Sequence, residues 1–334
     1  DSPISMISYC EQAKEPWQFL QLALEWNRVV HAKDKHLWDV PVAADSTASG
    51  LQLLSAMRRD PVGMKFSNLL PPDTTDAEPQ DAYMEVLRVA RELAALNEET
   101  KHLVDFLHHR SIGKPVLMVS IYGGSPSTNR KNIIQAYRDL GMYPDPINYQ
   151  DANQIEMLLR KASKQVFPMA FEALDWLKKL AKQAFKNGST DLRWNTPTND
   201  LIHLAEYTSD SQQIYTSHLG KVTIPTGKTT DPYYKKMNSG FAPNFVHSYD
   251  AAVLKASFQQ WNHPIALIHD CIRVLPNDMD RAMERIRKGF VRVCSGDRLA
   301  QLADDLGVPS TQLKRLTQGS GDLHSVLDSQ YMFN

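Results

Sequence analysis

The sequence has few cysteines and no long apolar run, and these two absences exclude several classes of protein. Only three cysteines occur among 334 residues, Cys10, Cys271 and Cys294, and their spacing is irregular. They support neither a disulfide framework nor a zinc site, so we expect a reducing, cytoplasmic environment. No apolar stretch reaches the roughly 18 residues of a membrane span, and no secretory signal opens the sequence.

Net charge, internal repeats and low-complexity segments are also lacking. The formal net charge is -1, with 42% hydrophobic and 22% charged residues, as in a soluble globular protein. The length allows two or three domains or subdomains. A near-neutral total does not exclude nucleic-acid binding, which needs only a local basic surface. The sequence begins Asp1-Ser2-Pro3, and we expect a processed product or a part of something longer.

Apolar periodicity predicts helices that are interrupted by short strands. Strands are expected to end at Asp45 and Ile268, and alternating residues over 214–225 predict a β-hairpin. Separate strand pairs between helices indicate an α+β fold rather than α/β. The predicted helices cover 16–31, 49–57, 81–96, 103–109, 111–123, 129–140, 151–187 with a break near Pro168, 276–292 and 296–306.

Two short apolar runs, far apart in the sequence, each end in an aspartate. Pro41-Val42-Ala43-Ala44 precedes Asp45, and the run from Pro264 to His269 precedes Asp270. Strands that bring both carboxylates to one point can hold Mg²⁺ together with substrate phosphates, and paired ions suit nucleotidyl transfer. Either aspartate alone is more often a turn residue after a strand. The prediction therefore depends on the two aspartates together.

Two cations and an aromatic residue recur between these runs at intervals of four. On a helix Arg110, Lys114, Met118 and Tyr122 form one stripe. Such a stripe can place phosphates near the cations and a sugar or base near the tyrosine. A solvated basic face, with Tyr122 in the core, is the alternative. Pro115 suggests that the regular helix begins near Gly113 or bends there.

Some histidines and lysines leave the alternatives open. His247 is either a buried structural residue or a polar contact in a cleft, and its spacing favours the structural role. His269, next to Asp270, is ambiguous from its local chemistry. Four lysines form a helical face that can meet a nucleic-acid backbone, although solvation is the commoner role for each. They are Lys178, Lys179, Lys182 and Lys186.

Together these motifs resemble those of the single-subunit RNA polymerases of phages and mitochondria. The segment from Asp45 to Gln52 is similar to motif A of that family. Arg110, Lys114, Tyr122 and Gly123 match motif B, and His269-Asp270 after an apolar strand matches motif C. The block 242–248, which contains His247, matches a further family segment. The resemblance covers essentially the whole chain, with the motifs in the family order.

The resemblance implies an α+β right-hand polymerase with an antiparallel palm sheet and mainly helical fingers. The palm would comprise residues 1–72, with motif A, and 246–334, with motif C and a C-terminal foot that ends Tyr331-Met332-Phe333-Asn334. The fingers would comprise 73–245 and include a promoter-specificity hairpin at about 200–236. The family's N-terminal domain and thumb, and the first part of its palm, have no counterpart.

The resemblance also implies residue roles in DNA-directed RNA synthesis. Asp45 and Asp270 would bind two Mg²⁺ ions, with the Ser46 carbonyl as a further ligand. Arg110 and Lys114 would contact the incoming triphosphate, and Lys114 would protonate the pyrophosphate. Two further contacts are implied with the nucleotide and the template. Tyr122 and His247 would recognise the ribose 2′-hydroxyl side, and Tyr83 would lie beside the templating base.

The implied partners are template and promoter DNA, the RNA transcript and ribonucleoside triphosphates. A second polypeptide would supply the missing parts, in the host bacterial cytoplasm if a phage encodes the protein. The sequence departs from the family pattern at Leu53, Pro115, Cys271 and Gly124-Ser125-Pro126. These departures concern phosphate contact and translocation more than the metal site. Two alternatives remain: a DNA polymerase of related architecture, and a non-catalytic DNA-binding subunit with a polymerase-like fold.

Overall fold

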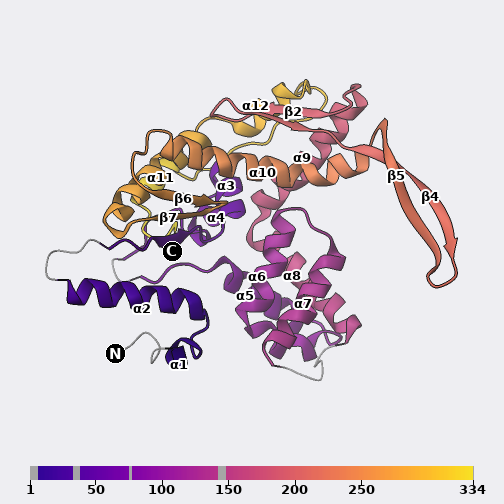
Figure 1. Ribbon diagram of the computed structural model, residues 1–334. Helices are drawn as coiled ribbons and strands as arrows, with labels where there is room; N and C mark the ends of the chain where they lie inside the picture. Colours follow the sequence, from indigo (N-terminus) through magenta and orange to yellow (C-terminus); the bar gives the residue numbers. More distant parts are fainter. Residues whose placement is uncertain (1–6, 33–37, 75–76, 142–147, 334) are drawn as a thin grey trace.

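The computed structural model describes residues 7–32, 38–74, 77–141 and 148–333. The opening Asp1-Ser2-Pro3 and the terminal Asn334 lie outside these ranges. Helices pack against one face of a small antiparallel sheet, and a long two-stranded ribbon extends from one end of the molecule (Figure 1). This mixture of helices and small antiparallel sheets agrees with the predicted α+β class. No helix in the described ranges is long and apolar enough to span a membrane.

The three-stranded sheet brings the two predicted strand ends together. Its order is β1 (Val42–Asp45), β7 (Cys271–Val274) and β6 (Ile265–Ile268). The register places Asp45 opposite Cys271, so Asp270 lies in the turn between β6 and β7. The backbone N–H of Ser46 donates to the Asp270 carbonyl at 3.1 Å. Strand β7 was not predicted, yet it is the central strand that joins β1 to β6.

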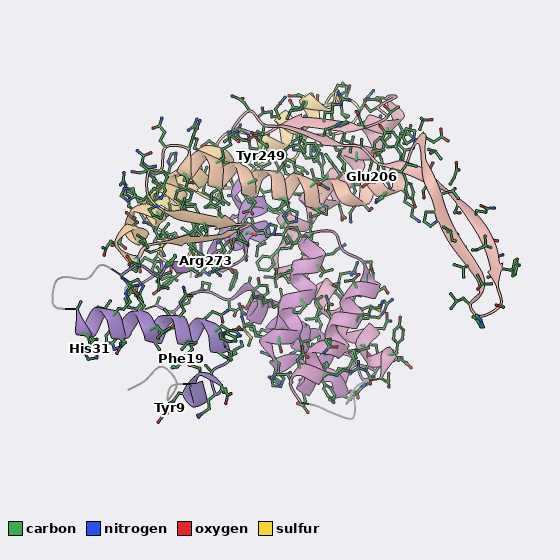
Figure 2. All side chains as sticks on the ribbon, in the orientation of Figure 1. Tyr9, Phe19, His31, Glu206, Tyr249 and Arg273 are labelled. Carbon is green, nitrogen blue, oxygen red and sulfur yellow. The ribbon has the colours of Figure 1, made fainter. Side chains whose placement is uncertain are left out.

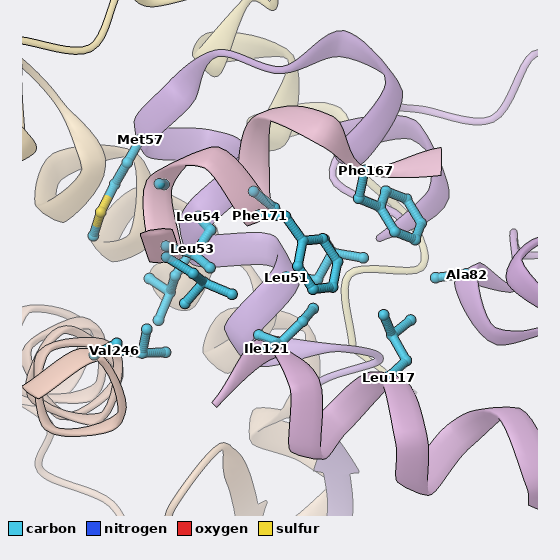
Figure 3. Close-up of a cluster of buried hydrophobic side chains, with 14 of the residues drawn as sticks. Leu51, Leu53, Leu54, Met57, Ala82, Leu117, Ile121, Phe167, Phe171 and Val246 are labelled. Carbon is cyan, nitrogen blue, oxygen red and sulfur yellow. The ribbon is translucent and has the colours of Figure 1, made fainter. Parts of the chain in front are cut away.

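A helical core packs behind this sheet. Helix α3 (Ser49–Arg58) follows β1 directly, and every one of its residues is buried. It packs against α9 (Pro168–Lys186), α10 (Tyr234–Phe258) and α11 (Met279–Cys294). Figure 3 shows apolar side chains of α3 meeting Ile121 and Val246 from two other helices. The short turn after Asp45 is therefore anchored to a rigid core.

The second helical group precedes α9 in the sequence. It contains α5 (Ala82–Ala95), the 3₁₀ helix η1 (Lys101–His108), α6 (Arg110–Ile121), α7 (Pro126–Asp139) and α8 (Tyr149–Val166). Helix α6 begins at Arg110, so the expectation of a start near Gly113 was wrong, while the alternative of a bend near Pro115 stays a prediction. Pro115 deprives only the Ser111 carbonyl of its helical partner, and Ser111 is exposed near the helix start, where water can replace the bond.

The predicted hairpin is present and longer than its alternating pattern indicated. It pairs β4 (Tyr207–Thr216) with β5 (Gly220–Pro232), and its side chains point into solvent on both faces (Figure 2). A smaller hairpin of β2 (Leu192–Asn195) and β3 (Leu201–Leu204) precedes it and was not predicted.

Helix α2 (Pro16–His31) lies along one side of the molecule and has the opposite of the usual burial pattern. Its one buried residue is Glu25, whereas Trp17 and Trp26 are 80% and 61% exposed. Phe19 also points outward (Figure 2). The predicted helix is confirmed, but its apolar side is left uncovered. The remaining elements are α1 (Ile7–Cys10), α4 (Pro61–Phe66), η2 (Pro276–Asp278), α12 (Arg298–Asp305) and η3 (Leu323–Asp328).

Candidate active site

Asp45 and Asp270, distant in sequence, interact electrostatically at one end of the sheet. Burial raises the pKa of the Asp45 carboxyl, and the negative charge of Asp270 raises it further. The Ser46 backbone N–H and the Lys114 ammonium act in the opposite direction and lower this pKa. Two carboxylates that repel each other in a half-buried site are stabilised by a cation. The pairing of strand ends that the sequence predicted is therefore present.

A third carboxylate, Asp250 of α10, joins this pair and was missed from the sequence. Burial raises its pKa to about 7, and the charges of Asp270 and Asp45 contribute in the same direction. Asp250 lies three residues after His247, so the two share one helix face. That spacing was the available signal, but it required recognition of α10 as a helix.

The acidic groups suit Mg²⁺, which water and substrate phosphates help to coordinate, better than a metal ion whose ligands all come from the protein. Within the described ranges, no three Asp, Glu, His or Cys residues form a ready metal-binding group. Mg²⁺ is commonly held by one or two carboxylates and completed by water and substrate phosphates. Asp45 and Asp270, with hard oxygen donors and mutual repulsion, fit that pattern.

Helix α6 places its stripe of residues along two adjoining cavities. The first, of about 140 Å³, is lined by Asp45 and Asp270 from the sheet and by Lys114 and Tyr122 from α6. The second, of about 230 Å³, shares Asp45 and Lys114 with the first and adds Arg110. The stripe therefore borders a cleft, and the alternative of a purely solvated basic face is not supported.

Arg110 and Lys114 differ in how they are held. The Arg110 Nε donates to Asp81 Oδ2 at 2.6 Å, and its guanidinium carbon lies 4.7 Å from the centre of the Tyr83 ring. Tyr83 lines both cavities. Lys114 is exposed and makes no hydrogen bond or ion pair with the described residues. A free ammonium beside two carboxylates can meet an anionic ligand without first breaking a bond.

Tyr122 and His247 stack at the inner end of the stripe. Their ring centres are 4.9 Å apart and their planes differ by 4°. The Tyr122 hydroxyl lies 3.1 Å from the Ser49 hydroxyl. Gly50 permits this approach of α3 and α6, because a Cβ there would lie 3.0 Å from the Tyr122 ring.

His247 is exposed, so the structural role favoured by its spacing was wrong. Burial of part of the ring lowers its pKa, His269 lowers it further, and Asp270 opposes both. His247 is therefore mainly neutral near pH 7 and can both donate and accept a hydrogen bond. His269 occupies the turn before Asp270 with φ 54°, in the left-handed region. Gly123 ends α6 with φ 72°, which glycine adopts without strain.

A buried amide links the turn after Asp45 to the end of the chain. Gln52 Nε2 donates to the carbonyls of Ser67 and Met332, each at 2.9 Å, and its Oε1 accepts from the Ser46 hydroxyl at 2.5 Å. Ser46 also pairs with Phe333 in an isolated β-bridge. The predicted C-terminal foot thus contacts the site through its described residues. The role of Gln52 was missed, because its partners are up to 280 residues away.

The predicted lysine face lies on α9. Lys179, Lys182 and Lys186 are exposed, as a nucleic-acid contact requires. A Cβ at Gly123 would lie 4.0 Å from Lys178 Cε, which places this lysine beside the end of α6. Contact of these lysines with nucleic acid stays a prediction.

Comparisons with known proteins match the chain to RNA polymerases. Residues 1–317 match the family model described as DNA-dependent RNA polymerase. The chain is 30% identical to the DNA-directed RNA polymerase of Pseudomonas phage phiKMV, over 87% of this chain and 37% of the relative. It is 28% identical to T7 RNA polymerase of Escherichia phage T7, over 99% and 44%. It is 25% identical to the mitochondrial DNA-directed RNA polymerase of Mus musculus, over 91% and 26%. The chain thus spans less than half the length of each of these relatives.

Proposed function

The chain belongs to the DNA-dependent RNA polymerase family, and we propose that it carries the catalytic centre of a template-directed RNA polymerase. The observation that supports this most strongly is the cavity shared by Asp45, Asp270, Lys114 and Tyr122. These residues come from three separate parts of the sequence. Acids for metal, a cation for phosphate and an aromatic residue for the nucleoside are the groups that nucleotidyl transfer needs.

In this proposal the palm consists of residues 1–72 and 246–334, and the fingers of 73–245. The palm supplies both carboxylates through β1 and the β6–β7 turn, and the fingers supply α6. The incoming ribonucleotide occupies the cleft between them. Its triphosphate lies towards Lys114 and Arg110, and its sugar lies towards Tyr122 and His247.

Asp45 and Asp270 would hold two Mg²⁺ ions, with the Ser46 carbonyl as an additional ligand. When bound, these ions would lower the pKa of the attacking RNA 3′-hydroxyl and stabilise charge on the leaving pyrophosphate. Lys114 would donate a proton to that pyrophosphate, since its ammonium has no hydrogen-bond or ion-pair partner among the described residues and borders the same cavity. The stacked pair of Tyr122 and His247 would hold polar groups for the ribose 2′-hydroxyl. A deoxyribonucleotide would lack the hydroxyl that this pair contacts and would lose that interaction.

We further propose that a second polypeptide completes the enzyme with the N-terminal domain, the thumb and the rest of the palm. Less than half of each relative's length is matched, which leaves room for these parts. The exposed apolar residues Phe19, Leu22 and Trp26 of α2 support the same proposal, because their spacing places them on one helix face and large exposed apolar groups in one patch are typical of an interface. The partner would therefore pack against α2.

The β4–β5 ribbon would contact promoter DNA. A two-stranded ribbon fits the major groove, and this one extends away from the helices with exposed polar side chains such as Gln212, Lys221 and Lys228 (Figure 1). With a phage origin, the enzyme would act in the cytoplasm of the host bacterium.

The test is primed RNA synthesis with Mg²⁺, in the presence and absence of a polypeptide that carries the remaining polymerase portion. Asp45→Asn and Asp270→Asn should each lower synthesis by at least about a thousandfold with little change in DNA binding. Asp280→Asn, which changes an exposed acid of α11, is the matched control. Undiminished synthesis by either active-site variant would refute the assignment.

The same assay separates the two alternatives. Equal incorporation of ribo- and deoxyribonucleotides would favour a DNA polymerase. DNA binding without synthesis, even with the partner and Mg²⁺ present, would favour a non-catalytic subunit.

A further inference from the structure

A basic groove lies between α10 and α11, outside the two cavities of the candidate active site. It has a volume of about 350 Å³ and is lined by Gln259 and Gln260 on one side and by Arg285, Lys288 and Arg292 on the other. Its lining shares no residue with the catalytic cavities. Gln259 follows Asp250 by nine residues, or about 13 Å along the helix axis. The proposed RNA-synthesis chemistry therefore does not account for this groove.

The cations form a regular row on α11. Arg281, Arg285, Lys288 and Arg292 are separated by four, three and four residues, so they lie on one helix face. The row extends over about 16 Å, a length of duplex axis along which each DNA strand carries roughly five phosphates. This length matches an extended polyanion better than a single small anion.

The row has little acidic compensation. Glu284 forms an ion pair with Lys288, which is one member of the row. Arg285 makes only a ring contact with Trp261, and the side chain of Arg292 has no hydrogen-bond or ion-pair partner among the described residues. Surface arginines on a solvated helix are commonly paired with acids at neighbouring turns. Here two guanidinium groups that border a groove, those of Arg285 and Arg292, have no acidic partner in the part of the chain that the structure describes.

Part of the row is held in place before any ligand binds. The guanidinium carbons of Arg281 and Arg285 lie 5.4 and 5.3 Å from the centre of the Trp261 ring. Arg281 Nη1 also lies 3.1 Å from His263 Nε2. Stacking of this kind restricts rotamers and leaves the guanidinium edges available to bind phosphate oxygens. Less side-chain entropy is then lost on binding.

The two walls of the groove are fixed by close packing of the helices. A Cβ on Gly289 would lie 2.1 Å from Ser257 Oγ, so α10 and α11 touch at this glycine. The Ser257 hydroxyl donates to the Val253 carbonyl at 2.6 Å, so its proton is not available to a ligand in the groove. The groove therefore has a rigid base with amide and guanidinium groups at its rims.

We propose that this α10–α11 groove is a second nucleic-acid contact, which binds the phosphodiester backbone of DNA or RNA outside the catalytic cleft. Arginine edges and glutamine amides bind phosphate oxygens without reading the base sequence. The contact retains nucleic acid on the enzyme and takes no part in bond formation. It rests on the proposed function only because a polymerase holds nucleic acid throughout its reaction.

The test is fluorescence anisotropy of the polymerase, with its partner polypeptide, against a labelled 30-base-pair DNA duplex and a 30-nucleotide RNA over a range of KCl concentrations. Arg285→Gln/Arg292→Gln removes two charges and puts neutral, polar amides in place of the guanidinium groups. We expect affinity to fall about tenfold at 0.1 M KCl for the nucleic acid that uses the groove. The slope of log Kd against log salt should fall by nearly two for DNA and somewhat less for RNA. Comparison of the two probes identifies which backbone is bound.

Two further variants serve as controls. Arg285→Lys/Arg292→Lys keeps both charges and should retain the wild-type salt slope. Lys161→Gln/Lys164→Gln removes two exposed charges from α8 and should leave groove binding unchanged.

Wild-type affinity and slope in the glutamine variant, for both probes, would overturn the proposal. An equal loss in the α8 control would overturn it as well, because net charge alone would then explain the effect. An enzyme that binds through the groove but makes no RNA would refute only the proposed catalytic function.

Discussion

Replacement of Asp250 by asparagine should stabilise the metal-free protein, and the gain should grow with pH. In the folded protein the pKa of Asp250 is raised from 3.8 to about 7, mainly by burial. A raised carboxyl pKa means that the folded state favours the protonated form. The stability associated with that proton is fully present below pH 3.8 and is lost as the pH rises through about 7. The Asp250→Asn variant has no charge to bury at this position, so its unfolding free energy does not decrease in this way as the pH rises.

The size of the effect follows from the shift. About three pKa units correspond to about 4 kcal/mol at pH values above 7, at 1.36 kcal/mol per unit. Between pH 5 and pH 8 the advantage of the asparagine variant should increase by about 2.5 kcal/mol. The change with pH is the informative quantity, because any constant cost of an unpaired amide cancels.

Urea unfolding followed by tryptophan fluorescence at four pH values, without divalent metal, measures this change. Asp280→Asn is the control, since that acid is exposed. Added Mg²⁺ should reduce the difference in unfolding free energy between wild type and Asp250→Asn, because a cation beside Asp45 and Asp270 stabilises the ionised form of Asp250. Parallel pH profiles for wild type and Asp250→Asn would refute the buried-charge argument.

Three further predictions concern the cleft, its support and the proposed interface. Tyr122→Phe should raise the ratio of deoxyribonucleotide to ribonucleotide incorporation by about tenfold or more, because one polar group no longer favours the 2′-hydroxyl. Competitive incorporation assays measure this ratio, and an unchanged ratio would mean that Tyr122 serves only the core. Gln52→Leu should lower the unfolding free energy by about 3 kcal/mol and reduce RNA synthesis, because it leaves the Ser67 and Met332 carbonyls without their amide donor. Thermal unfolding measures the loss of stability, and the control Gln301→Leu, at an exposed position, should show no such loss. Phe19→Ser/Trp26→Ser, on one exposed face of α2, should weaken binding of the partner polypeptide by at least about tenfold in sedimentation or pull-down titrations without changing the helical circular dichroism. Unchanged binding would exclude this face of α2 from the interface.

Local sequence patterns were sufficient to predict the elements that carry their own signal. The apolar runs before Asp45 and Asp270 predicted both strand ends, and the four-residue spacing from Arg110 to Tyr122 predicted the helix stripe. Helix α10 gave no such signal. Its buried residues lie on most of its circumference, so the sequence shows no single apolar face, and Pro243 lies inside it. Strand β7 has only four residues and follows a turn of two, which is too short for a clear alternating pattern.

Asp250 and Gln52 could not be assigned roles from the sequence for a related physical reason. The raised pKa of Asp250 arises from burial and from two acids on other elements. Gln52 is defined by acceptors in Ser67 and Met332, which only the tertiary fold brings near. Both residues lie around the turn that follows β1, and both act on Asp45 or Ser46 rather than on a substrate. The sequence thus predicted residues that line the shared cavity, such as Asp45, Lys114 and Asp270. The contacts of Asp250 and Gln52 form only when α10 and the C-terminal segment pack against the sheet.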